Sequence, residues 1–106
     1  MRILAKLTGA TPSSLYEAIY RDIRNGHIQT WVANKDNDLS HTGENNRFLW
    51  KGFMRPMTAA DGTATFELLP PSSNVFEHGI QGIFMGRFAE MLINHYGNNI
   101  AWMTMT

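Results

Sequence analysis

The apolar positions in the first quarter of the chain form two patterns. Residues 2–8 are a short, mostly apolar run that ends at a glycine, which is typical of a buried strand. Residues 11–26 open with Thr-Pro, a capping hydroxyl before a proline at the first helical position, and close with Asn-Gly. Their apolar side chains recur every four residues, at Leu15, Ile19 and Ile23. We therefore expect a helix with one stripe facing a core.

Alternation with a period of two dominates the middle of the chain. Residues 27–33, 47–57 and 63–69 alternate in this way, so we expect three strands. The Ala-Asp-Gly sequence at 60–62 is a tight-turn signal that joins the last two strands in a hairpin. Residues 34–46 are polar and predict a turn followed by a loop with room for one short strand.

A second helix and a last strand complete the pattern. Residues 74–96 follow a Pro-Pro-Ser-Ser break and carry apolar side chains at helical spacing, and residues 100–105 form a short strand. We predict an α+β fold: a small, mostly antiparallel sheet of four or five strands with two helices packed on one face, in the order β-α-β-β-β-α-β. The chain has 106 residues and no linker or internal repeat, so residues 1–106 are expected to form a single domain.

Three residues of the second predicted helix need a physical explanation. Gly82 and Gly86 each cost about 1 kcal/mol relative to alanine in a helix interior, and being four apart they share a face. We expect this face to approach the sheet closely, while a partner helix or a ligand in the same groove is the alternative. Arg87 lies at the margin of the apolar stripe with Glu90 as a partner, so it is either a structural anchor or an anion-binding group.

Composition narrows the classes of function. Nine Lys and Arg balance nine Asp and Glu, so no net charge holds the protein on a nucleic acid or a membrane, and we expect neither as a partner. The lack of cysteine excludes disulfides, a thiol nucleophile and thiolate metal ligands. No signal peptide, membrane span, cofactor-binding motif or nucleophile motif is found in the sequence. We therefore predict a cytoplasmic protein without a cofactor.

One polar segment gathers groups that bind metals or move protons. Asp36, Asp38, His41 and Glu44 fall within nine residues. A hard divalent ion could take the two aspartates and the glutamate, and His41 and Glu44 are candidate catalytic residues. These residues define one alternative function, a small metal-assisted or acid/base hydrolase with Arg47 stabilising an anion. The other interpretation is a solvated loop whose Asp and Asn side chains cap their own turns.

A second alternative depends on the strand predicted at 47–57. On such a strand Arg47, Lys51 and Arg55 share one face with Phe53. Cations interleaved with an aromatic ring suit single-stranded nucleic acid. The contrary interpretation is that long cationic side chains flank an exposed sheet face and discourage edge pairing, and charge neutrality favours it.

The leading hypothesis is a small interaction or ligand-binding protein that acts as a homodimer. Three Trp and seven Met exceed what a small core needs, and both residue types serve at interfaces. A protein partner or a second copy is expected, with a small molecule as the further option. The predicted subunit interface comprises Trp102, Met103 and Met105. The predicted binding residues are Trp31, Asp36, Asp38, His41, Arg47, Trp50, Lys51, Arg55 and Arg87.

Overall fold

The computed structural model describes residues 1–58 and 61–106, and within them it has six strands, two α-helices and two short 3-10 helices. In chain order the elements are β1 (Arg2–Leu7), α1 (Pro12–Arg24), β2 (Trp31–Ala33), β3 (Leu39–His41), η1 (Glu44–Asn46), β4 (Phe53–Met57), β5 (Thr63–Leu69), α2 (Ile80–Tyr96), η2 (Gly97–Asn99) and β6 (Ile100–Met105). No helix in this described part is long and apolar enough to cross a membrane.

The described strands form one antiparallel sheet in the order β2-β3-β4-β5-β1-β6. The α+β prediction and the pairing of β4 with β5 are confirmed, although Ala60 of the predicted turn lies outside the described residues. The prediction of four or five strands is wrong, because β3 makes a sixth. Polar Ser40 and His41 hide this strand in the sequence, yet both are buried between neighbouring strands.

Helix α1 begins where the sequence predicts. Thr11 Oγ1 accepts a hydrogen bond from the Ser14 amide at 3.1 Å, and Ser14 Oγ accepts one from the Thr11 amide at 3.0 Å. This reciprocal capping box, with the proline after Thr11, satisfies amides at the helix start. The helix ends at Arg24 with Asn25 as its C-cap, and its stripe buries Leu15 and Ile19.

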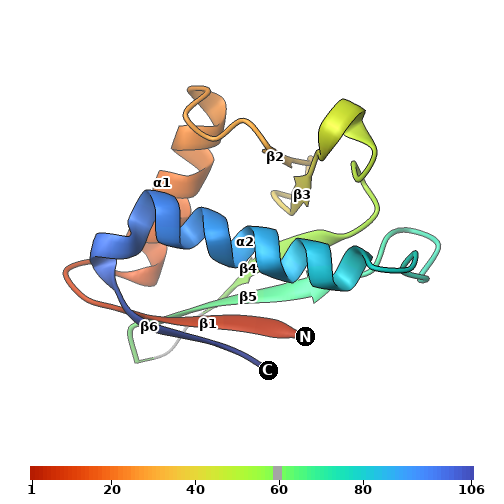
Figure 1. Ribbon diagram of the computed structural model, residues 1–106. Coiled ribbons are helices and arrows are strands. Elements are labelled where there is room, and N and C mark those ends of the chain that lie inside the picture. The colour runs from red at the N-terminus through yellow and green to blue at the C-terminus, as the bar shows by residue number, and fades with distance from the viewer. Residues whose placement is uncertain (59–60) are drawn as a thin grey trace.

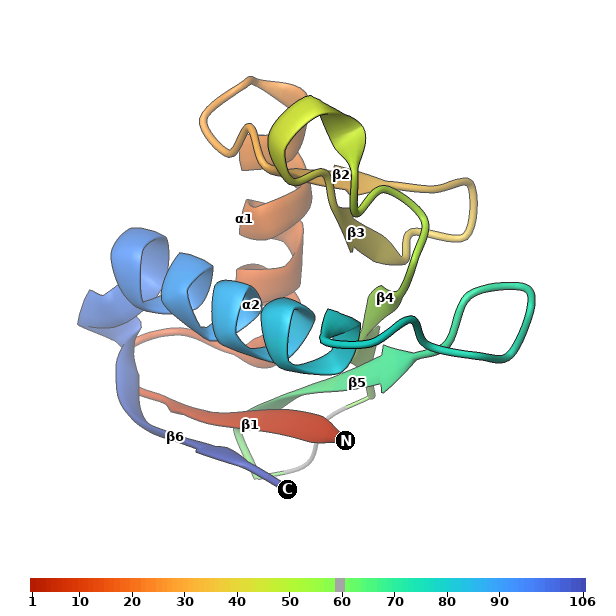
Figure 2. The same ribbon diagram turned by 45° about the vertical axis from the view of Figure 1, so that its right-hand side comes forward.

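The core lies between one face of the sheet and both helices. Ile3 of β1 pairs with Phe66 of β5, and the two side chains are fully buried. The next pair on that face, Ala5 with Ala64, is buried as well. Phe66 packs on Phe88 of α2 with ring centroids 4.7 Å apart. Figures 1 and 2 show both helices on this side of the strands and β2 and β3 rising beside α2, so the curved sheet brings β3 and α2 into contact.

The strand predicted at 47–57 is shorter in the structure and begins only at Phe53. Residues 47–50 lie in turns, and Trp50 has a left-handed φ of 62°. The Trp50 amide is held by Ser40 Oγ at 2.9 Å, so its backbone is fixed by β3 rather than by strand pairing. The face assignments made for 47–52 on the basis of a strand are therefore wrong.

Two other elements also begin later than predicted. The strand expected at 27–33 begins at Trp31, because the amides of residues 27 and 28 both donate to the Asp22 carbonyl at the end of α1. The second helix begins at Ile80, because Gly79 has a φ of 82° that a right-handed helix excludes.

The prediction that Gly82 and Gly86 approach the sheet is wrong. Both glycines are exposed, and a Cβ at either position would meet no atom within 4 Å. The face of α2 that does meet the sheet carries large apolar side chains, Phe84, Phe88 and Leu92, all fully buried.

Candidate functional site

Two adjoining hollows, which we call the His41 cleft, lie where α2 faces β2, β3 and η1. Their volumes are about 270 and 450 Å³, and both are lined by Thr30, His41, Arg87 and Glu90. The first extends toward His27 and His95, and the second toward Glu44 and Arg47. The cleft therefore gathers imidazole, guanidinium and carboxylate groups from parts of the chain far apart in sequence.

His41 ends β3 and forms part of the cleft wall. The residue is 7% exposed, and its ring meets Trp31 edge-on with centroids 5.0 Å apart. Nδ1 accepts a hydrogen bond from the Gly43 amide at 3.1 Å, so the neutral ring carries its proton on Nε2. Nε2 makes no hydrogen bond with a described residue. Every buried side-chain nitrogen or oxygen among these residues does have a hydrogen-bond partner, so Nε2 is not a buried atom. Nε2 is therefore accessible to solvent, and its N–H is a free donor in a residue that lines both hollows.

The surroundings of His41 favour its neutral form. Burial lowers the pKa of the imidazole below its ordinary value, and the positive charge of Arg87 lowers it further. The negative charge of Glu90 acts in the opposite direction but does not reverse the shift. His41 is thus an uncharged hydrogen-bond donor at neutral pH.

Two arginines supply positive charge to the cleft. Arg87 Nη1 lies 3.2 Å from Glu90 Oε1, and both side chains are 57% exposed. Arg87 is therefore no buried anchor, and most of its donors remain available after this one contact. The Arg47 guanidinium lies 4.6 Å from the centroid of the Phe48 ring and makes no ion pair with a described residue.

The loop after β3 sets the shape of the second hollow. Gly43 has φ 65° and ψ −176°, a conformation that is essentially restricted to glycine. A Cβ on Gly43 would lie 2.3 Å from Phe48 Cδ2, so the ring of Phe48 occupies the space that a side chain would need. The same glycine donates to His41, and Glu44 follows it at the start of η1.

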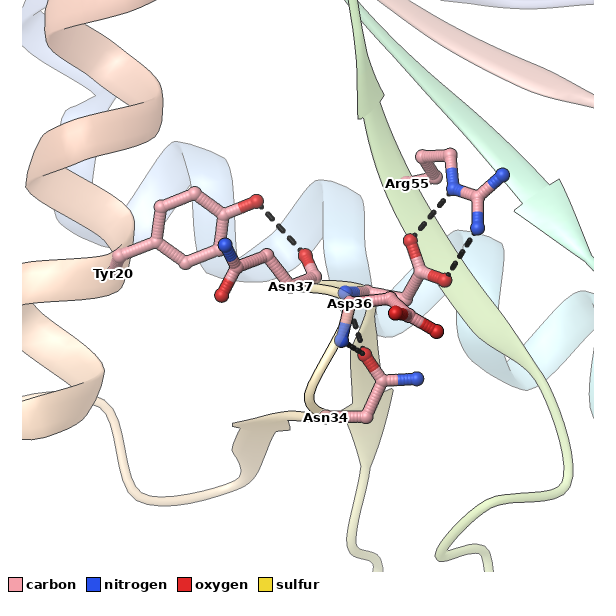
Figure 3. A network of polar contacts seen from close by, with 6 residues as sticks. Tyr20, Asn34, Asp36, Asn37 and Arg55 are labelled. Atoms are coloured by element: carbon pink, nitrogen blue, oxygen red, sulfur yellow. Dashed lines mark hydrogen bonds and ion pairs between the residues drawn. The ribbon is translucent and has the colours of Figure 1, made fainter.

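The aspartates of the predicted polar segment belong to a separate structural network (Figure 3). Asn34 Oδ1 accepts hydrogen bonds from the amides of Asp36 and Asp38, both at 2.9 Å. Asp38 is buried and forms two hydrogen bonds with Arg55, and Tyr20 Oη donates to the Asn37 carbonyl at 2.8 Å. These contacts agree with the second interpretation of this segment, in which Asp and Asn side chains cap the turns that they belong to.

The structure does not bring the proposed metal ligands together. In residues 1–58 and 61–106, no group of three His, Asp or Glu side chains is placed to hold a metal ion. Asp38 is occupied by Arg55, whereas Glu44 lines the His41 cleft. The metal-assisted version of the hydrolase therefore has no ligand set among the described residues.

The cationic strand face proposed for single-stranded nucleic acid does not form. Arg47 and Lys51 lie outside β4, and Lys51 Nζ is 2.6 Å from Glu77 Oε1. Arg55 is paired with Asp38, and Trp50 stacks on Phe53 with centroids 6.0 Å apart. Two of the three cations are thus compensated by carboxylates.

The remaining predicted residues divide between core and surface. Trp31 is only 1% exposed and packs edge-on against Phe84 and Phe88, so it supports the cleft from beneath. Trp102 and Met105 of β6 are 52% and 50% exposed, whereas Met103 is half-buried against the core.

The predicted binding residues did not include His27, Glu90 or His95, all of which line the cleft. His27 follows α1, while Glu90 and His95 lie on α2. Local patterns carry no signal for this grouping. It depends on the pairing of Trp31 with His41 and on the curvature that brings α2 against β3.

Comparison with known proteins found no matching protein-family model, no matching curated protein and no matching solved structure. Function is therefore argued from the chemistry of the site alone.

Proposed function

We propose that the protein binds a small molecule carrying an anionic oxygen group, a carboxylate or a phosphate, in the His41 cleft. The observation that carries the proposal is the neutral His41 ring, whose Nδ1 is occupied by the Gly43 amide and whose Nε2–H is a donor. Arg47 and Arg87 line the same hollow and add guanidinium donors with charge. Such donors match the oxygen atoms of carboxylates and phosphates.

The charges of the cleft favour a small ligand over a polyanion. Glu90 compensates Arg87 in part, and Glu44 lines the same hollow as Arg47. The net field is therefore modest, in keeping with nine positive and nine negative side chains in the whole chain. Binding would depend on directed hydrogen bonds from His41 and the two arginines more than on long-range attraction.

The tautomer of His41 supports binding over acid–base hydrolysis. A general base needs a free lone pair facing its substrate. In His41 the lone pair is on Nδ1 and accepts from Gly43, while the nitrogen open to the cleft bears the proton. The cytoplasmic location and the lack of a cofactor stay predictions from the sequence.

The test is a titration of isotope-labelled protein with inorganic phosphate and, separately, with acetate, followed by amide chemical shifts. Sodium chloride keeps the ionic strength constant. We expect saturable shifts centred on Gly43, whose amide donates to His41. Replacing Arg47 or Arg87 with glutamine should weaken binding about tenfold, the effect of losing one charge-assisted hydrogen bond.

The matched control is Arg24→Gln, because Arg24 is an exposed arginine at the end of α1 and lines neither hollow of the cleft. Its affinity for both anions should equal that of the unmodified protein. Equal weakening by Arg24→Gln, or shifts that rise without saturation over the whole surface, would refute the proposed site.

A further inference from the structure

We infer that β6 is the surface through which two copies of this chain associate, by antiparallel pairing of β6 with β6 of the partner subunit. The strand lies at one end of the sheet order and pairs only with β1 among the described strands. Figures 1 and 2 both show it on the outer side of β1. This inference names a surface for the predicted homodimer and is independent of the proposed ligand.

The backbone of β6 offers unused hydrogen-bonding groups on its outer side. Arg2 and Thr106 exchange two backbone hydrogen bonds of 3.0 Å, which fixes the direction of the peptide groups. Trp102 and Thr104 therefore also point their amides toward β1. Met103 and Met105 alternate with them and point theirs away from β1, where the described sheet has no further strand. The register of β6 against β1 shifts between Lys6 and Leu7, so Ala101 lies outside this regular alternation.

The sequence of β6 has none of the features that protect an edge strand. Residues 100–106 contain no charged side chain and no proline, whereas natural edge strands are commonly guarded by both. The opposite edge of the sheet, β2, has only three residues and so offers little to pair with. Trp102 and Met105 also expose about half of their surface on β6, at 52% and 50%.

The side chains of β6 are complementary to a second copy of themselves. A two-fold axis at Met103 would place Trp102 opposite Thr104 of the partner subunit, and Ala101 opposite Met105 of the partner subunit. Trp102 and Met105 then each meet a small side chain, Met103 meets its own copy, and no like charges face each other because the strand is uncharged. Such a contact repeats identically in both subunits, as a closed dimer requires.

The first part of the test is solution mass over a range of protein concentrations, by light scattering. We expect the mass to double as the concentration rises. Met105→Pro should give a monomer, because it removes an outward-pointing N–H without breaking a hydrogen bond to β1. Met105→Ala is the matched control: it loses the same side chain but keeps the N–H, and should still dimerise.

The second part of the test is amide hydrogen exchange, measured at the lowest and the highest protein concentration. In the dimer, exchange should slow at Met103 and Met105, whereas Trp102 and Thr104 should be protected at both concentrations. A monomer at every concentration, or a dimer whose outward β6 amides exchange as in the monomer, would overturn the inference. Because the cleft lies beside the other end of the sheet, monomeric Met105→Pro should still bind phosphate, so failure of one proposal is distinct from failure of the other.

Discussion

Arg55 and Asp38 join β4 to the turn before β3 through two parallel hydrogen bonds. Arg55 Nε lies 2.7 Å from Asp38 Oδ1, and Nη2 lies 2.7 Å from Oδ2. The Asp38 side chain is only 7% exposed, whereas that of Arg55 is 46% exposed. The arginine therefore acts as a partly solvated clamp on a buried carboxylate, and it fixes the turn from which His41 is positioned.

Removing this clamp should destabilise the protein more than removing an exposed ion pair. Arg55→Ala leaves the buried Asp38 carboxylate without its partner, so the urea midpoint of unfolding should fall clearly. The matched control is Arg2→Ala, since Arg2 lies 3.5 Å from Glu67 and both side chains are more exposed. Equal midpoints for the two variants would show that the bidentate geometry has no energetic consequence.

The hydrogen bond from Tyr96 to Asp22 should make stability depend on pH. Tyr96 Oη lies 2.7 Å from Asp22 Oδ2, and this bond, helped by Arg21, lowers the pKa of Asp22 despite its partial burial. The stabilisation is therefore present above about pH 4, the pKa of an unfolded aspartate, and is lost as pH falls through the lower folded value. Tyr96→Phe should cost roughly 1–2 kcal/mol near neutral pH and much less in acid, measured by urea unfolding.

At alkaline pH the same hydrogen bond makes stability fall as pH rises, the opposite direction from its effect in acid. Burial and the hydrogen bond to Asp22 raise the pKa of Tyr96, so its contribution is complete below about pH 10 and is lost above it. Tyr20→Phe is the control for the acid range, because Tyr20 donates to the Asn37 carbonyl, which does not titrate. A Tyr96→Phe deficit that stays constant from neutral to acid pH would contradict the assigned role of Asp22.

Local patterns predicted those parts of the fold that depend on neighbours in sequence. The start of α1 follows from Thr11 and Pro12, and alternation places Ala64 and Phe66 of β5 in the core. For β3 these patterns gave only room for one short strand within residues 34–46 and did not locate it. Ser40 is fully buried because its hydroxyl accepts from the Trp50 amide, a partner ten residues away that hydropathy does not reveal.

The sequence pointed to several residues of the candidate site, but it did not show that residues far apart in the chain lie together there. His41, Glu44 and Arg47 are close in sequence and do line one hollow. Arg87 was named from its position on a helix, but its place beside His41 results from the packing of α2 against β3. The aspartates of the same polar segment belong elsewhere, because Asn34 and Arg55 satisfy them.

Substitution of Gly43 should disturb both stability and the cleft. Alanine at this position would have to adopt a disfavoured backbone conformation, and its Cβ would lie 2.3 Å from the Phe48 ring. We therefore expect a loss of at least about 2 kcal/mol in the free energy of unfolding. Gly26→Ala is the control, since Gly26 has φ 78° but open space around it, and should cost about 1 kcal/mol. Denaturant unfolding measures both, and a Gly43→Ala loss no larger than that of Gly26→Ala would contradict the steric role of Phe48.

Acid should weaken the fold through His41, and the sign follows from its lowered pKa. The unfolded chain takes up a proton at this residue near pH 6.5, before the folded protein does, so protonation favours unfolding. His41→Asn keeps an acceptor for the Gly43 amide but cannot titrate. The stability of the unmodified protein relative to this variant should therefore fall as pH drops below 6.5, and level off below the folded pKa. Every other side chain is the same in both proteins, so its contribution cancels in the difference, which urea unfolding across this range measures. Parallel profiles for the two proteins would show that His41 is as free to protonate as in the unfolded chain, and would remove the neutral donor on which the proposed anion site depends.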